Sequence, residues 1–180
     1  MLDVEAYLDR LENPPYATMR DVVAKALPSI RPPRRIDVPG WAEADRMVRT
    51  PTYSGRWKND VAPYMVEPSR MATSRQFGAV VFVGPARTIK TDSLILNAVG
   101  HRVCCMPRTM LVVCPTKDAA REFSITKLDP MIRATDAVKA RQLKGRSADN
   151  TFDKLFAGNM RLRIGWPVIG QLSMVDIPDV

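Results

Sequence analysis

Two apolar runs dominate the hydrophobic pattern of the chain, one at residues 79–83 (AVVFV) and one that follows a threonine within residues 109–114 (TMLVVC). Strands that helices cover on both faces of a parallel sheet have such continuous runs. In residues 160–165, apolar residues alternate with arginines, which is typical of a strand with one face in the core. Residues 152–156 and a Gly-Asn pair precede this strand, so the pattern predicts a β-hairpin. Together these features predict an α/β domain with a mainly parallel sheet.

Apolar residues at helical spacing predict helices before, between and after these strands. The predicted helices are residues 2–12, 18–27, 39–48, 90–103, 116–127 and a short one that begins at residue 129. Thr18 begins a capping-box pattern, and Thr116 is a suitable N-cap residue. The stretch that begins at Pro28 is rich in proline and arginine, so we expect an extended basic linker there rather than a longer helix. The chain is therefore expected to consist of a helical N-terminal extension, residues 1–30, and a domain, residues 31–180.

The segment after the first apolar run, residues 84–91 (GPARTIKT), connects a predicted strand to a predicted helix. Phosphate-binding loops (Walker A) have this context and end in Gly-Lys-Ser/Thr. Lys90 and Thr91 occupy the positions of the lysine that reaches the terminal phosphates and of the hydroxyl that binds Mg²⁺. Ile89 replaces the second glycine, and a β-branched residue is costly at unusual backbone angles. The sequence predicts a nucleotide site in which binding is weakened or the loop is rearranged.

Several short segments together resemble a known protein family. They are GRW at 55–57, PY at 63–64, VVFVGPARTIKT at 80–91, VCPT at 113–116, AREFS at 120–124, LDPMIR at 128–133, ADNTFDK at 148–154 and GWP at 165–167. With these segments the chain, from about residue 31 to its end, resembles the ATPase half of the large terminase subunits of tailed bacteriophages, in the lambda-like group. These subunits are motor proteins that package viral DNA. The resemblance implies a three-layer P-loop NTPase fold (RecA-like, ASCE) with a mainly parallel sheet and a helical N-terminal extension.

The resemblance also implies the ligands, ATP and Mg²⁺, and the residues that hold them. The expected nucleotide-binding residues are Gly84, Pro85, Ala86, Arg87, Thr88, Ile89, Lys90, Thr91, Trp57 and Tyr64. Lys90 would hold the β and γ phosphates, Thr91 the magnesium ion, and Arg87 the γ phosphate, so that Arg87 and Lys90 are the expected catalytic residues. Trp57 and Tyr64 stand where this family holds the adenine base, although aromatic residues before a core strand more often fill the core.

The partners that the resemblance implies are double-stranded DNA, the small terminase subunit, the portal or procapsid, and further copies of the chain in an assembled motor in the host cytoplasm. The charge agrees with an anionic partner, because 27 lysines and arginines against 19 aspartates and glutamates give a net charge of +8. No apolar stretch is long enough to span a membrane. Cys104, Cys105 and Cys114 form no disulfide framework, and His101 has no metal-ligand partner, so we expect reduced core thiols and a histidine at a helix end or on the surface.

ATP hydrolysis also needs an acidic residue after an apolar strand, to hold magnesium, and a glutamate beside it. Asp176 and Asp179 do not complete this pattern, and residues 177–180 look like the lead-in to such a strand. We therefore expect a chain that stops before the acidic strand and lacks the nuclease domain, as a fragment or as a naturally shortened product. The alternative is a non-hydrolysing interaction or DNA-binding module with a degenerate loop. A P-loop kinase of small molecules is disfavoured, because the chain has no arginine cluster typical of a lid.

Overall fold

The structure is a computed structural model that describes residues 18–30, 34–74, 76–145 and 148–168. The chain divides into two compact units, Met1–Pro33 and Arg34–Val180. The described part of the first unit is helix α2 (Met19–Ile30). Its N-terminus has the expected capping box, because the Asp21 amide donates to Thr18 Oγ1 at 3.3 Å and the Thr18 amide donates to Asp21 Oδ2 at 3.2 Å. The helix predicted at residues 2–12 lies outside the described residues.

Helix α2 is longer than predicted, because it continues through Pro28 to Ile30. A proline in a helix removes one hydrogen bond, here the bond from position 28 to the carbonyl of Ala24. Since position 28 is in the last turn, only the end of the helix is weakened. The proline therefore does not end the helix where the sequence pattern predicted.

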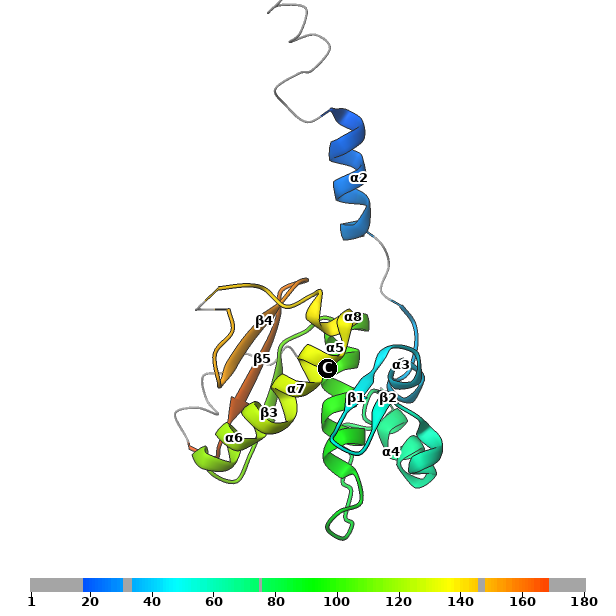
Figure 1. Cartoon of the computed structure of the whole chain (residues 1–180), viewed down its shortest axis with the longest axis vertical. Coiled ribbons are helices and arrows are strands. Elements are labelled where there is room, and N and C mark those ends of the chain that lie inside the picture. The colour runs from blue at the N-terminus through cyan, green and yellow to red at the C-terminus, as the bar shows by residue number, and fades with distance from the viewer. Residues whose placement is uncertain (1–17, 31–33, 75, 146–147, 169–180) are drawn as a thin grey trace, which may run out of the picture. The chain divides into compact units, whose positions relative to one another are not determined.

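The second unit is built from helices and two small sheets (Figure 1). Its elements before the candidate loop are α3 (Val38–Asp45), β1 (Met47–Arg49), β2 (Ser54–Arg56), the 3₁₀ turns η1 (Asn59–Val61) and η2 (Pro63–Met65), and α4 (Val66–Met71). Those after it are the π-helical turn η3 (Thr91–Leu96), α5 (Asn97–Cys105), β3 (Met110–Val113), α6 (Lys117–Phe123), the π-helical turn η4 (Ser124–Leu128), α7 (Asp129–Ala134), α8 (Asp136–Lys139), β4 (Asp153–Phe156) and β5 (Met160–Gly165).

The larger sheet has the strand order β3-β5-β4. Strand β3 is parallel to β5, with Val112 opposite Ile164, and β4 is antiparallel to β5, with Leu155 opposite Arg161. The predicted hairpin and the strand predicted at residues 109–114 are thus confirmed. Strands β1 and β2 form a separate antiparallel pair. Among the described residues the larger sheet is mixed and the smaller one is antiparallel, so the predicted mainly parallel sheet is not observed there.

The strand predicted at residues 79–83 is absent: these residues have no regular secondary structure. The Val81 and Val83 side chains are 85% and 91% exposed. An apolar run becomes a strand only where a neighbouring strand satisfies its amides and carbonyls, and no backbone hydrogen bond joins this segment to another described residue. Strand β3 is also less buried than predicted, because Val113 is 48% exposed.

Helix α5 lies between the larger sheet and the group formed by α3, α4, β1 and β2 (Figure 1). Its buried residues include Val99 and Val103, which belong to the same apolar core as Trp41 of α3 and Leu162 of β5. The expectation of a surface histidine is wrong, because His101 is buried in the middle of this helix with Nε2 2.6 Å from the Ile36 carbonyl oxygen. Burial lowers the pKa of His101, while the bond to this carbonyl opposes the shift.

The helical run α6-η4-α7 is continuous from residue 117 to residue 134, so the short helix expected at residue 129 extends the one before it. The predicted N-cap at Thr116 is confirmed, because its Oγ1 accepts a hydrogen bond from the Ala119 amide at 3.1 Å. The β4 residue Lys154 is buried, and its Nζ lies 2.8 Å from Asp129 Oδ1 and 2.7 Å from Asp149 Oδ1. This cluster joins the hairpin to the start of α7.

Candidate functional site

The predicted phosphate loop lies between the apolar segment and η3, and its lysine folds back onto it. Lys90 Nζ donates to the carbonyl oxygens of Gly84 at 2.6 Å and of Pro85 at 2.5 Å. Thr88 Oγ1 donates to the same Pro85 carbonyl at 2.9 Å. The loop is therefore closed on itself by three hydrogen bonds to carbonyl oxygens. An anion placed there would offer Lys90 a charged acceptor in place of two neutral ones.

Two residues of the loop have left-handed backbone conformations, Arg87 with φ 63° and Ile89 with φ 58°. This region costs an L-residue about 1–2 kcal/mol, and a β-branched side chain makes Ile89 an outlier. Ile89 stands where phosphate loops have glycine. Its backbone has a conformation that glycine adopts easily and isoleucine does not. Local strain of this kind is concentrated at functional sites.

The other predicted loop residues lie at the surface or half-buried. Arg87 is exposed, whereas Lys90 and Thr91 are half-buried at the start of the helical run η3-α5. Thr91 is the first residue of η3 and directly follows Lys90, whose amine holds the loop. Residues 84–91 thus form one small loop that the hydrogen bonds of Lys90 and Thr88 close.

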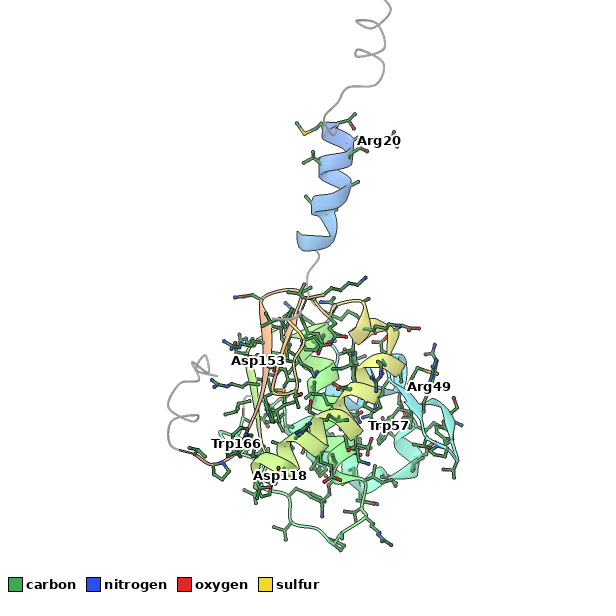
Figure 2. All side chains as sticks on the ribbon, turned by 60° about the vertical axis from the view of Figure 1, so that its left-hand side comes forward. Arg20, Arg49, Trp57, Asp118, Asp153 and Trp166 are labelled. Atoms are coloured by element: carbon green, nitrogen blue, oxygen red, sulfur yellow. The ribbon has the colours of Figure 1, made fainter. Side chains whose placement is uncertain are left out.

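The two aromatic candidates are placed differently. Tyr64 is 55% exposed, and its hydroxyl lies 3.5 Å from the Thr88 carbonyl oxygen of the loop. Trp57, labelled in Figure 2, is half-buried and packs against the core. Its ring centroid is 5.0 Å from Cζ of Arg46, and its Nε1 donates to Asn59 Oδ1 at 2.9 Å. Tyr64 therefore contacts the loop, and Trp57 contacts a buried arginine.

That arginine is a feature that the sequence pattern did not single out. Arg46 is 2% exposed, and its guanidinium hydrogen-bonds Asp92 and Asn97 in the helical run that follows the loop. Burial lowers the pKa of Arg46, and the adjacent Asp92 carboxylate opposes this shift. The only signal in the sequence is an Asp directly after the Lys-Thr pair, which is too common to indicate a buried ion pair.

Within the described residues, no cluster of further metal ligands accompanies Thr91, the residue predicted to hold magnesium. No group of three or more His, Cys, Asp or Glu residues there could hold a metal ion. Asp92 follows Thr91, but its carboxylate is engaged by Arg46. Asp176 and Asp179 lie outside the described residues. The loop therefore offers donors and positive charge for a phosphate chain and one hydroxyl for a metal.

A cleft of about 700 Å³ lies at the other end of the apolar segment. Its lining includes Phe77, Val80, Met106, Arg102 and Arg108. None of residues 84–91 is among its lining residues, so it is a separate feature from the loop. Within the described residues, no helix has the length and apolar character that a membrane span requires.

A comparison with known protein families gives a match. Residues 52–180 match the family model for the ATPase domain of the phage terminase large subunit gpA. Neither the curated proteins nor the solved structures contain a significant match. The matched region includes the loop at residues 84–91, Tyr64 and all of the larger sheet, and it covers more than half of the chain. The chain therefore belongs to the family of ATPase domains of phage terminase large subunits.

Proposed function

We propose that the chain binds ATP and Mg²⁺ through residues 84–91 and serves as ATPase part of a large terminase subunit, which couples ATP hydrolysis to the packaging of viral double-stranded DNA. The observation that carries this proposal is the loop itself. It lies inside the region that matches the family, and it has a strained glycine-like turn and a lysine held by loop carbonyls. The loop suits a polyphosphate chemically, because phosphate oxygens supply the acceptors that the Lys90 amine and the loop amides need.

In the proposed mechanism, Lys90 Nζ would exchange the carbonyls of Gly84 and Pro85 for the β and γ phosphates. The Thr91 hydroxyl would hold the magnesium ion, and the exposed Arg87 would contact the γ phosphate. Tyr64, beside the loop, would pack near the base. When bound, Mg²⁺ neutralises charge that develops on the phosphate oxygens. The protein's own contribution is to orient the phosphate chain and to place two cations around it.

Ile89 bears on affinity in a specific way. Its left-handed backbone is present in the structure without any nucleotide. The cost of this conformation therefore falls on the folding of the loop and not on binding. What remains for binding is the bulk of the half-buried isoleucine side chain beside the phosphates. We infer that Ile89 weakens nucleotide binding without abolishing it.

The finer fold that we propose is a three-layer P-loop NTPase domain in residues 31–180, with residues 1–30 as a helical extension. The support is the family match over residues 52–180 and the parallel pairing of β3 with β5.

The partners that we propose follow from the family, whose members work with DNA and a portal. They are double-stranded DNA, the small terminase subunit, the portal or procapsid, and further copies of the chain, in the host cytoplasm. The net charge of +8 supports a polyanionic partner. Binding to DNA is then expected to weaken steeply as the salt concentration rises.

A second candidate function is a non-hydrolysing interaction or DNA-binding module. The observations that favour it are the strained Ile89 and the lack of an acidic metal cluster in the described part of the chain. This reading predicts binding of DNA or protein partners without any dependence on nucleotide.

Calorimetric titration with Mg-ATP separates the two functions. The unaltered chain is expected to bind, Lys90→Ala to lose binding, and Ile89→Gly to bind more tightly. Lys58→Ala is the control, because it also removes one lysine charge but lies outside the loop, at an exposed position. If only Ile89→Gly binds, the loop is a disabled relic and the interaction module is favoured. If Lys90→Ala binds as well as the unaltered chain, the loop is not the nucleotide site.

A further inference from the structure

The helix that follows the loop begins with a π-helical turn, Thr91–Leu96, before α5 continues as an ordinary α-helix. The Asn97 amide donates to the carbonyl of Asp92, five residues earlier. Such turns are rare, and they are common at functional sites because they are held only where the surroundings favour them.

The guanidinium of Arg46 bonds both ends of the π-turn. Its Nη1 donates to the Asp92 carbonyl oxygen at 2.8 Å and to Asn97 Oδ1, and its Nη2 donates to Asp92 Oδ1 at 2.6 Å. The two partners are five residues apart, as are the donor and acceptor of the π-type hydrogen bond. From α4, Ser69 Oγ donates to the next carbonyl, that of Ser93, at 3.3 Å. Side chains from outside the helix therefore satisfy two successive carbonyls of the turn.

Arg46 is itself firmly placed. Its amide donates to the Ala42 carbonyl at the end of α3, and its carbonyl accepts from the Trp57 amide at 3.0 Å. The Trp57 ring covers the guanidinium, and Asn59 fixes the indole. Because Arg46 is almost fully buried, its charge is stabilised by the guanidinium bonds to Asp92 and Asn97 rather than by water.

The π-turn determines the direction of the residues before it. Helix α5 is fixed by its buried face, which includes Val99 and Val103. One residue inserted into a helix rotates the preceding residues by roughly 100° about the axis and displaces them by about 1.5 Å. Without the π-turn, Lys90 and Thr91 would point to a different side of the helix. The register of this turn therefore sets where the lysine and the hydroxyl meet the loop.

We propose that Arg46 is a positioning residue that locks the π-helical register of residues 91–97 and thereby aims Lys90 and Thr91 at the phosphate chain of a bound nucleotide. This role rests on the proposed function of the loop. The arginine acts through the helix, since its guanidinium is engaged by Asp92 and Asn97. Lysine is a poor replacement, because a single ammonium cannot reproduce the planar arrangement of donors that spans the two ends of the turn.

The test combines two measurements on Arg46→Lys. The first is hydrogen exchange of the amides at residues 94–97 in the nucleotide-free protein, which we expect to become about tenfold faster or more, because hydrogen bonds to a charged group are lost. Exchange of residues 99–105 is expected to stay within about twofold, because their protection reflects the core. The second is the affinity for Mg-ATP, measured well below the melting temperature, which we expect to fall about tenfold.

Two further variants keep the test decisive. Arg56→Lys is the matched control, because Arg56 also donates to a backbone carbonyl, that of Ala44, but is exposed; neither measurement should change. Asn97→Ala keeps the Arg46–Asp92 ion pair and should produce a smaller effect in the same direction, so it replaces Arg46→Lys if that variant does not fold.

Unchanged exchange at residues 94–97 in Arg46→Lys overturns the proposal, and so does faster exchange that is uniform over the core. Faster exchange at residues 94–97 with unchanged Mg-ATP affinity also overturns it, because the register of the π-turn would then not position Lys90 and Thr91 for nucleotide binding. If the unaltered chain binds no Mg-ATP, the proposed function fails, and the aiming role fails with it. Localised exchange in Arg46→Lys would then still identify Arg46 as the residue that holds the turn.

Discussion

The packing of α3 on α5 places Arg46 beside the π-turn, and it depends on the absence of a side chain at Gly100. An ideal Cβ at this position would lie 1.9 Å from Cη2, 2.5 Å from Cζ3 and 2.7 Å from Cζ2 of Trp41. Trp41 is completely buried, so its ring has no open space to enter. We therefore predict that Gly100→Ala destabilises the second unit.

Two opposing effects set the size of this change. Alanine gains about 1 kcal/mol over glycine from helix propensity. Overpacking costs about 1–3 kcal/mol, and three contacts far below van der Waals distance place Gly100→Ala at the upper end of that range. The net loss in the free energy of unfolding is then about 2 kcal/mol. For a unit of this size, such a loss lowers Tm by about 6 °C.

Urea denaturation followed by circular dichroism measures this loss as a lower midpoint with an unchanged m value. Trp41→Phe removes the part of the ring that a Cβ would meet, so Gly100→Ala should cost less in that background than in the natural chain. A more stable Gly100→Ala variant would refute the reasoning. An equal loss in both backgrounds would also refute it, because the clash with Trp41 would then not be the cause.

Three further predictions concern buried polar groups. Lys154→Met should lower the free energy of unfolding by about 2 kcal/mol, because the hydrogen bonds of the buried ammonium to Asp129 and Asp149 are lost. Lys144→Met at an exposed site should change it by less than about 0.5 kcal/mol, and equal urea midpoints for the two variants would contradict this. Burial lowers the pKa of His101, so the unfolded chain binds an extra proton below about pH 6.5 and the free energy of unfolding falls as the pH drops below that value. In His101→Gln the free energy of unfolding should therefore change less between about pH 7 and pH 5. Parallel pH profiles for the variant and the unaltered chain would count against this. Burial raises the pKa of the Cys104 thiol to about 11. Iodoacetamide at about pH 8 should therefore alkylate the half-buried Cys114 before the buried Cys104, and equal alkylation rates by mass spectrometry would disprove this order.

The elements that follow from neighbouring residues were predictable. The hairpin turn has positive φ at Gly158 and Asn159, the two residue types that tolerate it best, and alternation in the flanking strands sets the register. Thr116 caps its helix through a bond to a residue three positions later. In both cases the determining contacts are close in sequence, so the local pattern is sufficient.

The features that were missed depend on residues far apart in the chain. Arg46 bonds residues 46 and 51 positions away, and His101 bonds the carbonyl of Ile36, 65 positions away. No periodicity reports such partners. The apolar run at residues 79–83 has the composition of a strand, but a strand also needs a paired neighbour, which the described residues do not provide.

For the candidate site, the pattern located residues 84–91 and the unusual Ile89, and the structure shows the left-handed backbone at that residue. The pattern could not show that Lys90 bonds the loop carbonyls or that Trp57 lies on Arg46, because both depend on side-chain directions set by packing. The roles of these residues in nucleotide binding stay predictions.

The most direct test of the nucleotide site is a map of the backbone amide resonances of the ¹⁵N-labelled chain during titration with Mg-ATP. We predict saturable shifts centred on residues 84–91, with smaller changes through the π-turn to residue 97 and with none in β4. No saturable shift, or shifts centred on the cleft at Phe77, Arg102 and Arg108, would contradict a nucleotide site in the loop.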